Sequence, residues 1–151
     1  MMRARRLRTI ALGYLMAAGE ADAAELAWAQ FERATNMTDR QGALSVLAGS
    51  DAPQRQAALE AFHARFRNDP LVIDKWFTTQ ALSTRDDTLE AVLQLARHPD
   101  FTLSNPNRVR ALVGAFGANQ RAFHARDGRG YAFVADQILA LVNARFAEAS
   151  K

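Results

Sequence analysis

Helix-start signals recur at short intervals along this chain, and they constrain the fold more than any other feature. An acidic or amide residue followed by proline occurs at 69–70 and 105–106, where proline at the first helical position loses no hydrogen bond. Between the signals, apolar residues repeat with helical spacing, and no stretch is convincing as a strand. Connections of two to six residues make successive helices antiparallel neighbours. We therefore predict an all-α fold.

The pattern predicts seven or eight helices. Helix pairs recur at roughly 30 residues, which suits an irregular α-superhelix, or solenoid, of antiparallel pairs, with a helical bundle as the other arrangement. Capping chemistry predicts N-caps at Thr38 (boxed with Gln41) and Asp51, and a box of Ser83 with Asp86. The expected helices cover approximately residues 3–18, 22–34, 39–48, 52–66, 70–82, 84–97, 106–117 and 131–147.

Charge and composition exclude several classes of protein. The net charge is only +3, and four arginines lie within the first eight residues, so no distributed basic face for nucleic acid is expected. There is no cysteine, which excludes disulfides and thiolate sites and is compatible with a cytoplasmic location. The apolar run at 9–19 is too short to span a bilayer, so no membrane partner is expected.

Both ends of the chain suggest a larger parent protein. The paired methionines at residues 1 and 2 resemble a start codon added to a fragment. The last expected helix is apolar around most of its circumference, which indicates that more protein packs on it. We expect residues 1–151 to form a single helical domain, truncated at both ends.

No constellation of catalytic or metal-binding residues is evident. His63, His98 and His124 are isolated in the sequence, and neither H-E-x-x-H nor G-x-S-x-G occurs. The sequence "HPD" at 98–100 is typical of a helix-ending turn. We therefore predict no catalytic residue and no metal site in this chain. The aromatic residues Trp28, Phe31, Trp76 and Phe77 are expected to be core anchors, and Lys75, next to Asp74, is expected to be solvated.

The stretch "FTLSNPNRVRALVGAF" (101–116) is the exception. With Asn105 as N-cap, an ideal helix places Arg108 and Arg110 on opposite flanks of an apolar stripe. Gly114 and Gly117 share the flank of Arg110, which suggests that a ligand or another backbone comes close there. Arg110 could then bind a carboxylate, or it could form an inter-helix ion pair beside closely packed helices. The expected stripe consists of Val109, Leu112, Val113 and Phe116.

Four segments together resemble the C-terminal helical domain of the bacterial aminopeptidase N family, the zinc-dependent alanyl aminopeptidases of the gluzincin type. They are "NMTDRQGAL" (36–44), "DKWF" (74–77), "FTLSNPNRVRALVGAF" (101–116) and "AFHARDGRGYAFVADQI" (122–138). The resemblance covers nearly all of the chain and is most specific from residue 101 to 138.

The resemblance implies a non-catalytic domain that caps a catalytic chamber and shapes peptide access in an enzyme that releases N-terminal amino acids. The zinc ion, the H-E-x-x-H glutamate and the G-A-M-E-N loop would belong to other domains of the parent chain. The implied partners are therefore the parent's catalytic domain and its peptide substrates, and the chain alone is not an enzyme. The alternative is a free-standing α-solenoid that binds protein partners on its concave surface.

The family's N-P-N-R-x-R motif is present at residues 105–110. The resemblance implies that Arg110 faces the chamber, and it makes Arg110, Asn107 and Arg108 the substrate-channel candidates. Of these, Arg108 is expected to be structural and Arg110 to meet peptide. His124 and Tyr131 are carried over as structural residues only.

Overall fold

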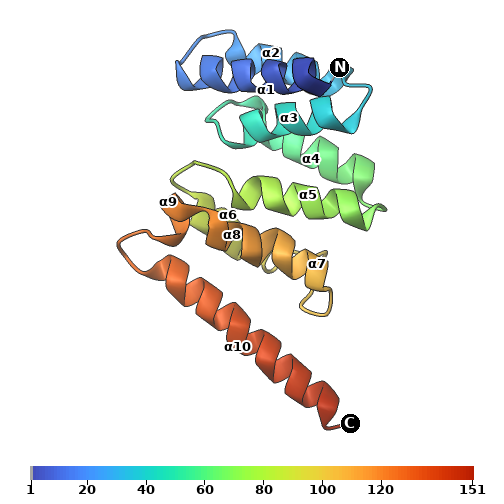
Figure 1. Ribbon diagram of the computed structural model, residues 1–151, viewed down its shortest axis with the longest axis vertical. Helices are drawn as coiled ribbons and strands as arrows, with labels where there is room; N and C mark the ends of the chain where they lie inside the picture. The colour runs from blue at the N-terminus through green and yellow to red at the C-terminus, as the bar shows by residue number, and fades with distance from the viewer. Residues whose placement is uncertain (1) are drawn as a thin grey trace. The chain divides into compact units, whose positions relative to one another are not determined.

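Helices are the only regular elements among residues 2–151, the part of the chain that the computed structural model describes (Figure 1). This confirms the all-α prediction. Met1, which we interpreted as an added start residue, lies outside the described residues. The chain divides into two compact units, Met1–Asn68 and Asp69–Lys151. No helix of the described part is both long enough and apolar enough to cross a membrane.

The first unit contains four helices. They are α1 (Met2–Ala17), α2 (Ala23–Arg33), α3 (Met37–Ala48) and α4 (Gln54–Phe66). Helix α3 packs against the other three, and its Leu44 and Leu47 are fully buried, as is Phe62 of α4. Gly19 ends α1 with φ of 75°, a left-handed conformation that favours glycine, as the sequence predicts.

Two predicted caps in this unit are wrong. Asn36, not Thr38, caps α3: its extended backbone lets its side chain accept a 2.8 Å hydrogen bond from the Asp39 N–H. Thr38 therefore lies inside the first turn. Asp51 does not cap α4, because that helix begins three residues later, directly after Pro53.

The second unit contains the remaining helices. They are α5 (Pro70–Ala81), α6 (Thr88–Leu95), α7 (Pro106–Val109), the π-helical segment η1 (Arg110–Gly114), α8 (Ala115–Ala118), α9 (Gln120–Phe123) and α10 (Arg129–Ala149). The elements α7, η1 and α8 follow one another without a break, and α5 packs beside them (Figure 1). The sequence predicts one helix here but gives no sign of its π-helical middle.

Helix starts in this unit match the prediction where proline follows the cap. Asp69 caps α5 by accepting a hydrogen bond from Val72, and Pro70 takes the first position. The predicted box of Ser83 and Asp86 is wrong, because the Ser83 hydroxyl accepts from Arg85 in the connection and α6 begins only at Thr88. The short helix α9 occupies a stretch expected to be a loop or turn.

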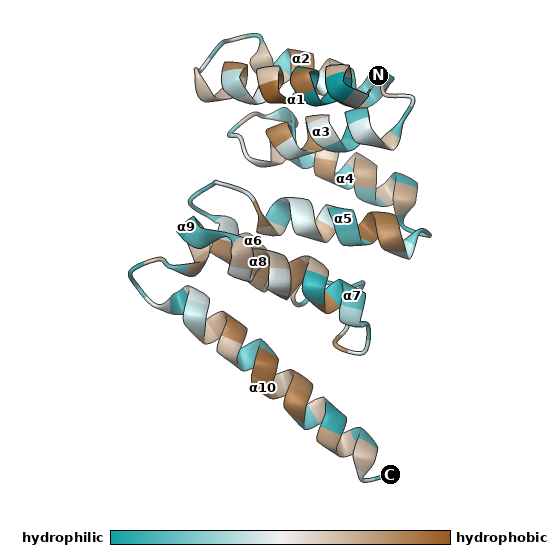
Figure 2. Cartoon of the chain, viewed as in Figure 1, coloured by the Kyte–Doolittle hydropathy of each residue, from teal (hydrophilic) through white to brown (hydrophobic). Residues whose placement is uncertain are grey.

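The predicted core aromatics are largely buried, whereas most of the last helix is not. Phe31, Trp76 and Phe77 are buried as predicted, and Trp28 is half-buried, stacked on Phe31. In α10, by contrast, only Gly130 and Phe133 are buried. Apolar residues continue along the helix to its end (Figure 2), and beyond residue 137 four large ones on one side are exposed: Ile138, Leu139, Val142 and Phe146.

Candidate functional site

The candidate site is the helix start at residues 105–110, in the second unit. Asn105 has the extended backbone of an N-cap, and its side-chain oxygen accepts hydrogen bonds from the N–H groups of Asn107 (3.0 Å) and Arg108 (3.2 Å). Pro106 takes the first helical position, as predicted. Local chemistry thus determines where Asn107, Arg108 and Arg110 enter the helix.

Arg108 is buried, with 6% of its surface exposed, so its predicted place on the flank of the buried stripe is wrong. Its Nε lies 2.5 Å from Oδ1 of Asp74, on α5. The two Nη atoms donate to the backbone carbonyls of Asp100 and Pro70, and the guanidinium carbon lies 5.1 Å from the ring centre of Phe77. Arg108 therefore joins α5, the 98–105 connection and α7.

The ion pair resolves the electrostatic conflict at this helix start. An arginine in the first turn opposes the positive end of the helix dipole, and burial adds the cost of desolvating its charge. The carboxylate of Asp74 offsets both effects, and two backbone carbonyls each accept a hydrogen bond from one Nη. Lys75, beside Asp74, is exposed as expected, and no local sequence signal pointed to the pairing of Asp74 with Arg108, 34 positions away.

Arg110, two residues later, is exposed and begins η1. Its Nη1 donates a 3.4 Å hydrogen bond to Oδ1 of Asn107, which is also exposed. The structure thus brings Arg110 and Asn107 together and places Arg108 on the opposite, buried side.

Arg110 lies on the wall of a groove of about 790 Å³ within the second unit. Both apolar and polar groups line it, including a second guanidinium and one carboxylate from α10. This combination could accept the carboxylate and apolar side chain of a short peptide. The lining residues are Leu103, Ser104, Pro106, Val109, Arg110, Leu141, Ala144, Arg145, Glu148 and Ala149.

The two glycines beside Arg110 face open space. A Cβ added to Gly114 would meet only the Cβ of Arg110, at 3.8 Å, and one added to Gly117 would meet none of the described residues within 4 Å. No backbone of the second unit therefore approaches these glycines closely enough to require them, and the close-packing interpretation finds no support there.

The buried stripe differs from the ideal-helix expectation because of the π-helical segment. Leu112, Val113 and Phe116 are buried as predicted, but Arg108 joins them and Val109 is only half-buried. An i→i+5 turn holds about one more residue than an α turn, so residues four apart come closer to the same face. Residues 108, 112 and 116 are spaced in this way.

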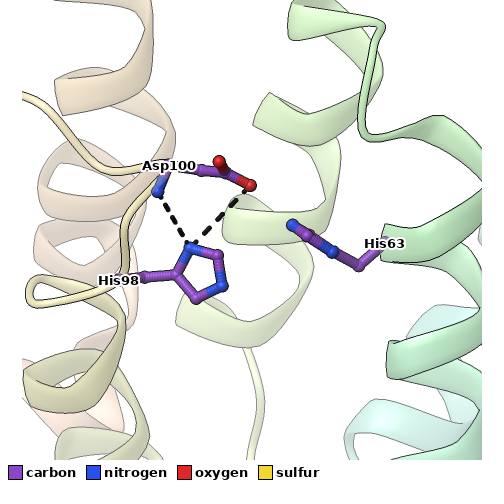
Figure 3. Close-up of side chains that lie close together, drawn as sticks. All are labelled: His63, His98 and Asp100. Atoms are coloured by element: carbon purple, nitrogen blue, oxygen red, sulfur yellow. Dashed lines mark hydrogen bonds and ion pairs between the residues drawn. The ribbon is translucent and has the colours of Figure 1, made fainter.

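The "HPD" turn at 98–100 helps to hold the side chain of Arg108 in place. Nδ1 of His98 accepts a 3.1 Å hydrogen bond from the N–H of Asp100 and lies 3.9 Å from its carboxylate (Figure 3). The His98 ring also contacts Trp76 and Phe77. These contacts confirm a turn after α6, and they hold the Asp100 carbonyl that accepts from Arg108.

Comparison with known proteins relates nearly the whole chain to one family of helical domains. A family model described as a domain of unknown function (DUF3458_C) with ARM repeats matches residues 1–149. Aminopeptidase N of Escherichia coli (strain K12) is 44% identical over 136 residues, which cover 89% of this chain and 16% of that protein. Aminopeptidase N of Caulobacter vibrioides is 48% identical over 110 residues, covering 72% of this chain and 13% of that protein.

A solved structure agrees with these sequence relatives. The crystal structure of Legionella pneumophila aminopeptidase A in complex with aspartic acid matches with a TM-score of 0.86 and 41% identity, over 91% of this chain and 16% of that one. The chain thus spans 13–16% of the length of these proteins. The matches confirm the resemblance to aminopeptidase N and the predicted solenoid of helix pairs.

Proposed function

This chain belongs to the DUF3458_C family of ARM-repeat domains, and we propose that it is a non-catalytic helical domain of a zinc aminopeptidase, where it covers the catalytic chamber and shapes the access of peptides. The names of the relatives support the aminopeptidase activity of the parent. The share of each relative that the chain covers supports a longer parent protein of which residues 1–151 are one segment. A cytoplasmic parent is part of the same proposal.

The observation that carries the proposal is the contrast between the two arginines. Arg108 makes structural contacts with its whole guanidinium, whereas the guanidinium of Arg110 is exposed on a groove wall and, among residues 2–151, hydrogen-bonds to Asn107 alone. A guanidinium offers two parallel N–H groups to a carboxylate or carbonyl of a peptide. Arg110, with Asn107 as its orienting neighbour, is therefore the proposed contact for the part of the peptide beyond the scissile bond.

The chemistry of hydrolysis is assigned to other domains of the parent. A zinc ion would polarise the scissile carbonyl and activate water there. Residues of this chain would bind and orient the peptide, and none of them is given a role in a bond-breaking step.

Arg110→Ala in the full-length enzyme tests the proposal. One charge-assisted hydrogen bond contributes about 1.5–3 kcal/mol, so kcat/KM for short peptides should fall by about 10- to 150-fold. The loss for an alanyl anilide, which has no residue beyond the scissile bond, should be much smaller. Arg110→Lys keeps the charge without the planar fork and should recover part of the loss. Equal losses on both substrates would mean that Arg110 does not contact peptide.

A further inference from the structure

The π-helical segment begins at the residue that the proposed function uses, Arg110. In an α-helix the N–H of Ala115 would donate to the carbonyl of Ala111. Here it donates to the carbonyl of Arg110, five residues back. The Ala111 carbonyl thereby loses its ordinary α-helical partner, which is costly where the backbone is buried, and Ala111 is buried.

A side chain of another helix supplies a new partner. The hydroxyl of Thr78, on α5, donates a 3.0 Å hydrogen bond to the Ala111 carbonyl. π-Helical turns are rare and are frequently found at functional sites, and a buried backbone group that such a turn displaces needs another hydrogen-bond partner. Thr78 provides such a contact.

Thr78 and Asp74 are one helical turn apart on α5, so they face the same neighbour. Asp74 pairs with Arg108 just before Arg110, and Thr78 bonds to Ala111 just after it. The backbone of Arg110 is therefore fixed to α5 on both sides, while its side chain points into the groove.

We propose that Thr78 is a positioning residue: its hydrogen bond to the Ala111 carbonyl holds the π-helical turn and so aims Arg110 at the peptide. This inference rests on the proposed function, because it concerns the same contact between Arg110 and the part of the peptide beyond the scissile bond.

The test uses the full-length enzyme and the ratio of kcat/KM for a short peptide to kcat/KM for an alanyl anilide. Thr78→Val keeps the shape of the side chain and removes the donor. It should raise the peptide KM and lower the ratio by about 2- to 10-fold, the effect of one neutral hydrogen bond. Thr78→Ser restores the hydroxyl and should restore the ratio.

The neighbouring threonine supplies a matched control. Thr79 is buried, and its hydroxyl donates to the Lys75 carbonyl within α5. Thr79→Val also removes a hydroxyl from α5, but it should leave the ratio unchanged. If Thr79→Val lowers the ratio as Thr78→Val does, the effect belongs to α5 in general and the inference is overturned.

A double variant separates positioning from general damage. If Thr78 acts through Arg110, then Thr78→Val should not lower the ratio further when Arg110→Ala is already present. A further drop in that background overturns the inference. An unchanged ratio in Thr78→Val alone also overturns it, while a loss in Arg110→Ala leaves the proposed function standing. No loss in Arg110→Ala itself refutes the proposed function first.

Discussion

Nε of Arg108 lies 2.5 Å from Oδ1 of Asp74, and both side chains are largely buried. The pair connects residues 34 positions apart, and it lets Arg108 leave the surface while Arg110 stays on it. An isolated guanidinium at this depth would be unstable, so the position of the whole 105–110 turn depends on one carboxylate of α5.

Asp74→Ala should therefore lower the free energy of unfolding by about 3 kcal/mol, because it leaves the buried charge of Arg108 without its counter-ion. Urea unfolding of the 151-residue chain measures this. Asp86→Ala is the matched control: its 2.5 Å ion pair with Arg121 is exposed, and such pairs contribute less than about 1 kcal/mol. Similar losses in both variants would contradict a special role for the Arg108–Asp74 pair.

The contacts around residues 105–111 explain which features of the site could be predicted from the sequence and which could not. The starts of α5 and α7 were predicted correctly, because the cap, the proline and the bonded N–H groups lie within four residues of one another. The burial of Arg108 and the π-helical turn were not, because they depend on Asp74 and Thr78, on another helix. A projection at constant helical period cannot include such contacts.

Loss of the Asn105 N-cap should lower the free energy of unfolding by less than loss of the Asp74 carboxylate does. Asn105→Ala removes the acceptor for two N–H groups at the start of α7 and should cost about 1 kcal/mol of unfolding free energy. Asn107→Ala, at an exposed position two residues later, should stay within about 0.5 kcal/mol of the native chain. Chemical unfolding of the two variants side by side checks the difference, and a larger loss in Asn107→Ala would contradict the capping assignment.

Gly114→Ala and Gly117→Ala should each stabilise the chain by about 0.5–1 kcal/mol, because alanine is the better helix former and its Cβ has room at both positions. Thermal unfolding should show a higher Tm for each. Gly130→Ala is the contrasting variant: its Cβ would lie 2.5 Å from the Phe123 carbonyl oxygen, so Tm should fall. A lower Tm in Gly114→Ala would mean that the flank of Arg110 is closely packed after all.

The exposed apolar side of α10 should make the isolated chain self-associate. Leu139 and Phe146 are 61% and 70% exposed on a side that also carries Ile138 and Val142. Sedimentation velocity should show association that rises with concentration, and Leu139→Glu combined with Phe146→Glu should reduce it. Leu71→Glu changes an equally exposed leucine at the start of α5 and should have no such effect. A chain that stays monomeric at high concentration would contradict this prediction.

The isolated chain should not hydrolyse an alanyl anilide, with or without added zinc. Zinc hydrolases bind the metal through clustered histidine and carboxylate ligands and need a base beside the bound water, and the sequence contains no H-E-x-x-H segment to supply them. Release of the aniline is followed by absorbance, with the full-length enzyme as positive control. Turnover that purifies with the chain, depends on zinc and survives Arg110→Ala would show a catalytic centre in this domain, and the assignment of catalysis to other domains would then be wrong.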